Sequence, residues 1–146
     1  MAIVHSQWWC IEIPDDWSAE EDDGGVSIAD PDDVGELYIS ALKKEPGDAG
    51  HSDTAIDRAE LRALAAELIE QGSAEQQCAV AGLQGLYFAY TQDQLAWREW
   101  YLTDGATLLL ASYNCEPDNV QLDAAPLEQM LESLVLVDNN ELAKPD

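Results

Sequence analysis

The sequence predicts an α+β domain in which a twisted antiparallel β-sheet of about six to seven strands is flanked by two α-helices. Three observations support this prediction. Residues 86–113 contain three strand-like runs separated by turn signals, two other stretches carry apolar residues at helical spacing, and 146 residues are enough for one hydrophobic core.

The strongest strand signal lies in three aromatic and aliphatic runs at residues 86–90, 95–102 and 106–113. The last two are separated by Asp104-Gly105, and such a pair favours a two-residue type I′ turn, whose central residues both need positive φ. A weaker turn is expected at Gln92-Asp93. The expected pairs around the Asp-Gly turn are Thr103–Ala106, Tyr101–Leu108, Glu99–Leu110 and Trp97–Ser112.

Both faces of this meander are expected to be largely apolar, because side chains alternate between the two faces of a strand. One face would carry Leu86, Phe88, Tyr90, Trp97, Glu99 and Tyr101. The other would carry Arg98, Trp100, Leu102, Thr107, Leu109 and Ala111. An antiparallel sheet with one wet face alternates more cleanly, so each side should be covered, with any remaining apolar area packed by loops or left for a partner.

The spacing of apolar residues and the positions of Gly and Pro predict the other elements. Strands are expected at residues 7–13, 25–30, 36–43 and 77–83, and helices at 55–71 and 125–137. Gly72 would cap the first helix, and Pro126 lies in the first turn of the second. The apolar stripes of the two helices are Ile56, Leu61, Leu64, Ala65, Leu68 and Ile69, and Leu127, Met130, Leu131, Leu134 and Val135. Residues 1–138 are predicted to form a single domain, followed by a polar tail at 139–146.

Composition bounds the compartment and the partners. Thirty acidic and six basic residues give a net charge of −24, which makes nucleic acid and anionic membranes poor partners and favours a protein partner, a basic one in particular. Residues 12–36 hold eleven acids and no base, and these are expected to lie mostly in solvated loops. Without an apolar run of 18 residues or a signal-like N-terminus, the expected location is cytoplasmic.

No motif for catalysis, for a metal or for a cofactor is present. Cys10, Cys78 and Cys115 are far apart and are expected to be small thiols within the fold, and His5 and His51 are isolated. There is no glycine-rich phosphate loop and no nucleophile elbow, so an enzyme is not expected. The acid of most interest is Glu99, which lies among aromatic residues and would lose hydration unless a partner compensates it.

A resemblance covers nearly the whole chain. Residues 9–17 read Trp-Cys-Ile-Glu-Ile-Pro-Asp-Asp-Trp, an Asp-Gly-Gly turn follows, and residues 36–42 read Glu-Leu-Tyr-Ile-Ser-Ala-Leu. Together with the element order βββαββββα, these stretches resemble Mog1/PsbP-like domains, in particular small uncharacterised bacterial members. The resemblance implies a fold and transfers no functional residue, because relatives of this architecture have unrelated roles.

The predicted function is therefore a non-enzymatic protein-binding module, an adaptor or chaperone that uses exposed sheet. The residues predicted to bind are Trp8, Trp97, Glu99, Trp100 and Tyr101. One alternative is an acidic immunity or inhibitor protein that masks a basic toxin or nuclease through charge complementarity. Another is a small-molecule-binding domain with a pocket between a helix and the sheet.

Overall fold

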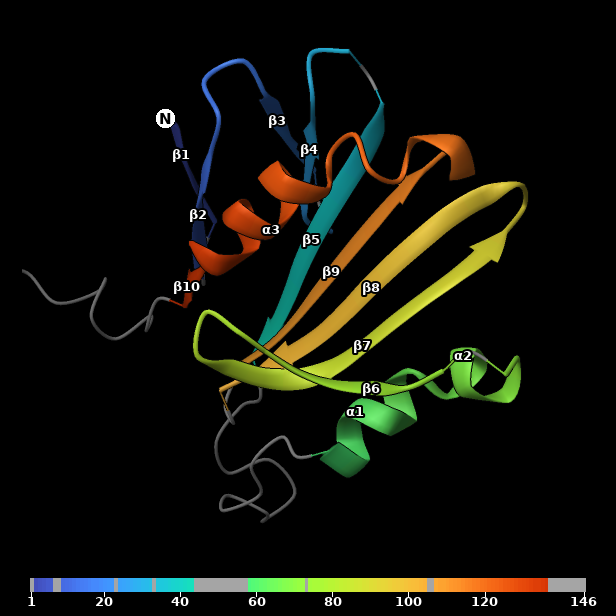
Figure 1. Cartoon of the computed structure of the whole chain (residues 1–146). Helices are drawn as coiled ribbons and strands as arrows, with labels where there is room; N and C mark the ends of the chain where they lie inside the picture. The colour runs from blue at the N-terminus through green and yellow to red at the C-terminus, as the bar shows by residue number, and fades with distance from the viewer. Residues whose placement is uncertain are drawn as a thin grey trace, which may run out of the picture.

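The computed structural model describes residues 2–6, 9–22, 24–32, 34–43, 58–72, 74–104 and 107–136. Within these ranges the chain forms a seven-stranded and a three-stranded sheet, with helices on both sides of the larger sheet (Figure 1). The strands are β1 (Ala2–His5), β2 (Trp9–Ile13), β3 (Ser18–Glu21), β4 (Val26–Ala29), β5 (Gly35–Lys43), β6 (Gln76–Val80), β7 (Leu83–Gln92), β8 (Leu95–Thr103), β9 (Thr107–Cys115) and β10 (Val135–Leu136). The helices are α1 (Arg58–Leu64), α2 (Ala66–Glu70), the 3-10 helix η2 (Pro117–Asn119) and α3 (Ala124–Glu132).

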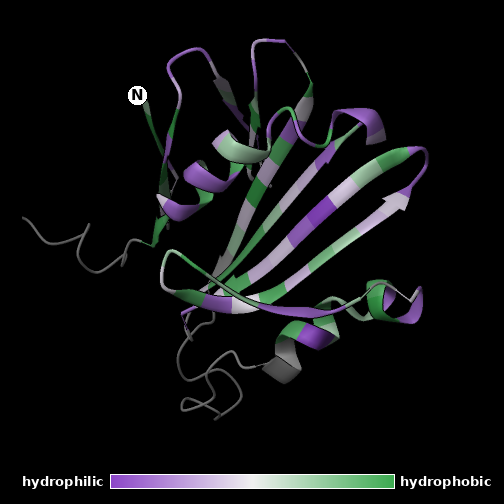
Figure 2. Cartoon of the chain, in the orientation of Figure 1, coloured by the Kyte–Doolittle hydropathy of each residue, from purple (hydrophilic) through white to green (hydrophobic). Residues whose placement is uncertain are grey.

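The larger sheet has the strand order β3-β4-β5-β9-β8-β7-β6, and all of its pairs are antiparallel. We call inner the face that carries Leu37, Ile39, Trp100, Leu102 and Leu109, and outer the face that carries Trp97, Glu99 and Tyr101. The α+β prediction, with a twisted antiparallel sheet flanked by helices, is confirmed. Apolar and polar residues alternate along β5 and β9, as Figure 2 shows, so these strands have one covered face and one wetter face.

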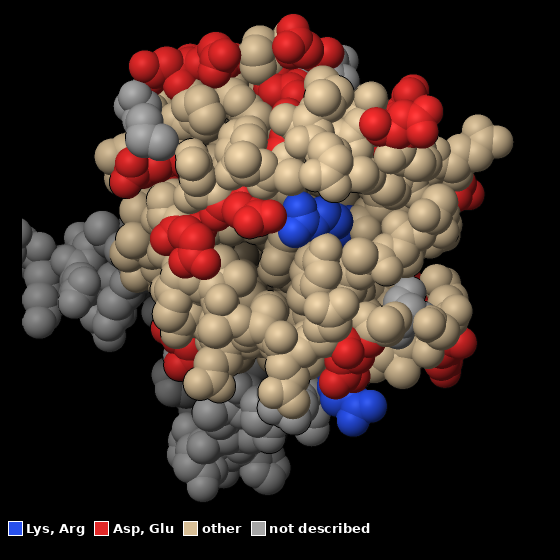
Figure 3. Space-filling view, viewed as in Figure 1, with Lys and Arg blue, Asp and Glu red and all other residues tan. Residues whose placement is uncertain are grey.

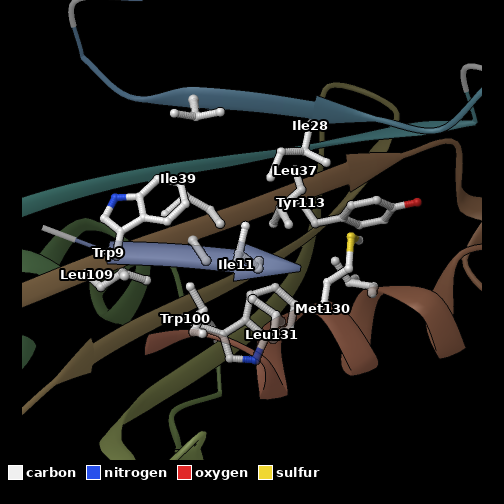
Figure 4. Close-up of a cluster of buried hydrophobic side chains, with 14 of the residues drawn as sticks. Trp9, Ile11, Ile28, Leu37, Ile39, Trp100, Leu109, Tyr113, Met130 and Leu131 are labelled. Carbon is white, nitrogen blue, oxygen red and sulfur yellow. The ribbon is translucent and has the colours of Figure 1, made fainter. Parts of the chain in front are cut away.

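The first predicted strand does not join the larger sheet, which corrects the expectation of one sheet. β2 pairs with β1 and β10 and lies against the inner face. Its Trp9 and Ile11 are each 1% exposed and pack into the main core together with α3. Figure 4 shows Trp9 beside Ile39 and Leu109, with Met130 and Leu131 of α3 across β2. The small sheet therefore acts as a second layer that closes the core.

Both turns of the meander differ from the prediction, the second in length and the first in position, but the face assignments hold. Thr103 pairs with Leu108, not with Ala106, so the loop spans four residues. The Asp104 carboxylate accepts a hydrogen bond from the Thr107 amide at 2.9 Å, which stabilises this longer loop. Gly105 and Ala106 lie outside the described residues. The shift of register is two residues, and since the strand period is also two, every side chain keeps its predicted face.

The tight type I′ geometry occurs instead in the preceding turn. Asp93 and Gln94 have φ of 55° and 68°, and Gln92 pairs with Leu95. The loop therefore lies one residue later than the predicted Gln92-Asp93. Both central residues adopt positive φ here without glycine, so the sequence signal for this turn was weak.

The two faces are covered unequally. α3 and β2 lie on the inner face, whereas α1 and α2 pack on the outer face near β7 through Leu61, Ala65 and Leu68. The predicted helix at 55–71 is divided at Ala65, and its residues 55–57 lie outside the described residues. Leu64, predicted to belong to the apolar stripe, is 49% exposed. Gly72 ends the helical segment with a φ of 91°, as predicted.

The closing helix is shorter than predicted. α3 ends at Glu132, and Val135, expected on its apolar face, instead begins β10 and is 55% exposed. The predicted tail at 139–146 lies outside the described residues. Over the described part of the chain, no helix is long and apolar enough to cross a membrane.

The acidic segment of residues 12–36 is more ordered than the predicted loops. β3 forms an edge strand of four exposed residues, and this strand contains Glu20 and Glu21. A charged edge disfavours pairing with further strands. On the face seen in Figure 3, carboxylates gather at the upper edge and over α3, and a basic group lies near the centre.

Candidate functional site

Among the described residues, no helix covers the outer face beyond α1 and α2. The buried outer residues that contact these helices lie on β7, β8 and β9, and they are Leu86, Phe88, Tyr101 and Leu108. On β3, β4, β5 and the far halves of β8 and β9, outer side chains are half-buried or exposed. We call this region the open face: Ser18, Glu20, Ser27, Ala29, Glu36, Tyr38, Ser40, Trp97, Glu99, Leu110, Ser112 and Asn114. Its side chains come from five adjacent strands, so it is a continuous surface.

Glu99 lies at the boundary between the open face and the helix-covered region. The Tyr90 hydroxyl donates a hydrogen bond of 2.5 Å to Glu99 Oε2, and the Tyr101 hydroxyl donates one of 3.0 Å to Oε1. The predicted need for a partner is therefore met by two tyrosines. Burial, followed by the hydrogen bond and the charge of Glu99, raises the pKa of Tyr90. The pKa of Tyr101 is raised by burial and by the same carboxylate, so both hydroxyls remain donors.

Next to Glu99 the open face has a hollow of about 170 Å³. Its lining residues are Tyr38, Ser40, Glu99, Trp100, Tyr101, Leu110, Ala111 and Ser112. Ser112 pairs with Glu99 on one side and with Tyr38 on the other, and Leu110 pairs with Tyr101 and Ser40. The hollow exists because small serines lie between larger residues on neighbouring strands.

Tyr38 forms the far wall of the hollow and is itself fixed by a carboxylate. Its hydroxyl donates to Asp22 Oδ1 at 2.9 Å, and that oxygen also accepts from the amides of Gly24 and Gly25. The amide of Gly24, the Tyr38 hydroxyl and the amide of Gly25 lower the pKa of Asp22. A second negative group therefore stands behind the wall opposite Glu99.

The five predicted binding residues separate into three groups. Trp97, Glu99 and Tyr101 share the outer face; Trp97 stacks on Tyr90 with ring centroids 6.2 Å apart and planes at 3°. Trp100 lies on the inner face and is 5% exposed, so its ring belongs to the core. Trp8 lies outside the described residues. Sequence reasoning missed Tyr38, Ser40 and Ser112, because the predicted register placed Glu99 opposite Leu110.

The inner face carries its own aromatic cluster next to Trp100. The Arg98 guanidinium lies 4.9 Å from the Trp100 ring centroid and 5.5 Å from that of Tyr87. Its Nε donates to the Tyr87 hydroxyl at 2.9 Å. Cation–π contacts of this kind can hold a half-buried Arg in place. We therefore assign Arg98 to the packing of the inner face.

A buried pair of carboxyl groups joins the start of α3 to the turn after β4. Asp30 and Asp123 are 9% and 5% exposed, and the Tyr113 hydroxyl donates to Asp123 Oδ2 at 2.8 Å. Asp30 accepts from the Val34 amide at 2.8 Å. Burial and the hydrogen bond with Asp30 raise the pKa of Asp123 to about 6, despite the opposing effect of Tyr113. Protonation of Asp123 at a pH below about 6 therefore stabilises the native state relative to the unfolded chain.

Replacing Asp123 with asparagine will remove a pH dependence of stability. The pKa of Asp123 is about 6 in the folded protein and 3.8 in an unfolded chain. The stabilisation that comes from protonating Asp123 is therefore complete below pH 3.8 and is lost as the pH rises through 6. The amide donates to Asp30 as the protonated acid does. Between pH 4 and 7, Asp123→Asn should gain up to about 3 kcal/mol of unfolding free energy relative to the wild type. Urea unfolding at several pH values measures this gain.

The control for this prediction is Asp118→Asn, which removes the same charge from an exposed position in η2. Its stability difference from the wild type should change little over the same pH range. A pH-independent stability difference between Asp123→Asn and the wild type would contradict the raised pKa of Asp123.

Solved structures reveal the fold of the chain. A protein from Bacteroides thetaiotaomicron VPI-5482 matches 91% of this chain with a TM-score of 0.66 and 19% identity. The chain spans 46% of the length of that protein. Cyanobacterial PsbP (CyanoP) from Synechocystis sp. PCC 6803 matches 90% of this chain and 88% of its own, with a TM-score of 0.58 and 11% identity. The chain has the Mog1/PsbP-like fold.

A third protein with the Mog1/PsbP-like fold is LpqN, which is involved in cell envelope biogenesis of Mycobacterium tuberculosis. It matches 89% of this chain and 83% of its own, with a TM-score of 0.55 and 18% identity. By sequence, no family model and no curated protein matches the chain. The predicted resemblance is thus confirmed as a fold. At these identities the Mog1/PsbP-like fold does not bring a function with it.

Proposed function

We propose that this chain is a non-enzymatic protein-binding module and that a basic partner protein docks on the open face. The observation that carries the proposal is the composition of that face. Glu20, Glu36 and Glu99 project from it, and none of its residues is basic. Because the whole chain carries a net charge of −24, the field of the molecule adds to the local attraction for a basic surface.

The geometry favours charge over apolar contact as the source of this binding. Trp100 and Tyr101 are 5% and 8% exposed, so they cannot form an apolar docking surface without unfolding. Trp97 is half-buried at the margin of the open face and is the aromatic residue best placed to contact a partner. An adaptor with a basic partner therefore fits better than a chaperone for apolar segments.

An acidic inhibitor of a basic toxin or nuclease would use the same surface, and it remains our second candidate. Eleven acids lie within residues 12–36, and three of them, Glu20 and Glu21 on β3 and Glu36 on β5, favour it. The inhibitor hypothesis differs from the adaptor hypothesis in one respect. An inhibited partner must lose an enzymatic activity when it binds this protein. A small-molecule role has weaker support, because the hollow beside Glu99 is only about 170 Å³, and the larger hollows of about 370 and 510 Å³ near η2 have mostly polar linings, whereas ligand pockets are mostly apolar.

The test compares two charge-reversed variants of equal net charge. Glu20→Lys/Glu36→Lys alters the open face, and Glu12→Lys/Glu128→Lys alters exposed acids of β2 and α3 on the other side of the larger sheet. A partner is captured from a source-cell lysate at low salt and identified by mass spectrometry, and its association with each purified variant is measured. The open-face variant should associate at least about tenfold more slowly, whereas the other variant should keep most of its rate.

If the association rate falls equally in the two variants, only the net charge of the protein matters, and the open face is not the docking site. An association rate that does not fall between low and high salt would overturn the basic partner. Inhibition of an enzymatic activity of the partner would select the inhibitor over the adaptor. The proposal places the protein in the cytoplasm, which is compatible with Cys10, Cys78 and Cys115 being free thiols.

A further inference from the structure

The hollow beside Glu99 is lined by two hydroxyls, those of Ser40 and Ser112, that have no hydrogen-bond partner among the described residues. Among the described residues, the Glu99 carboxylate forms no ion pair and accepts side-chain hydrogen bonds only from Tyr90 and Tyr101. The hydroxyls of Ser40 and Ser112 are half-buried. A half-buried carboxylate and two hydroxyls therefore face one cavity with hydrogen-bonding capacity that no described residue uses.

We propose that this hollow is a subsite for a primary ammonium group, the end of a lysine side chain of the partner. The inference rests on the proposed function, since it names the group that the open face receives. An ammonium ion has three donors and no acceptor, and the hollow offers the Glu99 carboxylate and the hydroxyls of Ser40 and Ser112. Leu110 and the Tyr101 ring line the same cavity and can cover the methylene stem.

The tyrosines explain why ammonium fits better than guanidinium. An arginine forms its best contact side-on, with two parallel hydrogen bonds to both oxygens of one carboxylate. Each oxygen of Glu99 already accepts a hydroxyl, from Tyr90 on one side and Tyr101 on the other. A side-on arginine would compete with both tyrosines, whereas a single ammonium donor needs only one remaining lone pair.

The direct test uses n-butylammonium as the probe and n-butylguanidinium as the comparison compound with an arginine-like head group. Amide chemical shifts of the full chain are followed by NMR during titration of each compound. We expect saturable shifts for Ser40, Glu99 and Ser112 with n-butylammonium, and at least about fivefold weaker binding of n-butylguanidinium. Equal binding of both compounds, or no saturable shift at these three residues, would overturn the ammonium subsite.

Two variants test the residues of the hollow separately. Glu99→Gln keeps the size of the side chain and removes its charge, and it should weaken n-butylammonium binding about tenfold. Ser112→Ala leaves Glu99 and its tyrosines intact and should weaken binding about threefold. The matched control is Glu36→Gln, which removes a charge from the open face outside the hollow and should change binding less than twofold. Unchanged binding in both Glu99→Gln and Ser112→Ala would contradict the assignment.

The same variants distinguish failure of the subsite from failure of the proposed function. If the partner protein binds Glu99→Gln as tightly as the wild type but loses affinity for Glu20→Lys/Glu36→Lys, the open face is the docking site and the lysine subsite is wrong. If n-butylammonium binds in the hollow while the partner ignores the open face, the subsite stands and the proposed function fails.

Discussion

Replacing Trp9 with alanine will lower the free energy of unfolding by about 4 kcal/mol, the range measured for large aromatic residues removed from cores. Trp9 is 1% exposed and is among the largest side chains that are fully buried. Its ring packs between the inner face and the small sheet, next to Ile39 and Leu109 (Figure 4). Urea unfolding followed by far-UV circular dichroism measures the loss.

The control for this substitution is Trp97→Ala, which removes the same side chain from a half-buried position on the outer face. It should cost less than about 2 kcal/mol, because it leaves no closed cavity in the core. A loss of 1 kcal/mol or less for Trp9→Ala, on the order of a surface substitution, would show that β2 is not part of the main core.

Gly85→Ala is expected to cost about 3 kcal/mol or more, because the new methyl group has no space in the sheet. Gly85 pairs with Leu102 on β8 and with Cys78 on β6, so neighbouring strands hold its backbone from both sides. A Cβ atom there would overlap the carbonyl oxygen of Tyr101 and crowd the Cα of Leu102. Thermal and urea unfolding measure the effect.

Gly82→Ala separates this overlap from the general cost of adding a methyl group to glycine. Gly82 lies in the turn between β6 and β7 with a φ of 83° and open space around it. Its replacement should cost only about 1 kcal/mol, the strain of a left-handed alanine. Equal losses at the two positions would mean that β7 shifts to accept the methyl group and that the close approach to β8 is not fixed.

The parts of the fold that the sequence predicted are those with clear turn signals or helical spacing. β7, β8 and β9 were placed on the correct faces because the register of each pair differs from the prediction by two residues, which is the period of a strand. β1, β3 and β10 were missed for different reasons. β3 reads Ser-Ala-Glu-Glu and is fully exposed, so it has no apolar pattern, and β10 is two residues long. β1 forms only through its pairing with β2.

The candidate site was predicted only in part, because it depends on register. Glu99 was singled out from its aromatic surroundings, and the structure supplies Tyr90 and Tyr101 as its partners. The hollow could not be foreseen, since a turn longer by two residues moves Ser112 into the place opposite Glu99. Loop length is set by local bonds such as that from the Thr107 amide to Asp104, which an Asp-Gly pair does not specify.

Along β5, β8 and β9, neighbouring residues lie alternately on the inner face, which belongs to the main core, and on the outer face. Residues such as Leu37, Ile39 and Leu109 are fully buried and fix the chain in its fold, while their immediate neighbours in sequence Tyr38, Ser40 and Leu110 lie on the other side of the sheet. Changes at every second residue of these strands can therefore alter the open face while the core stays intact. This separation makes the scaffold suitable for engineering new binding specificities.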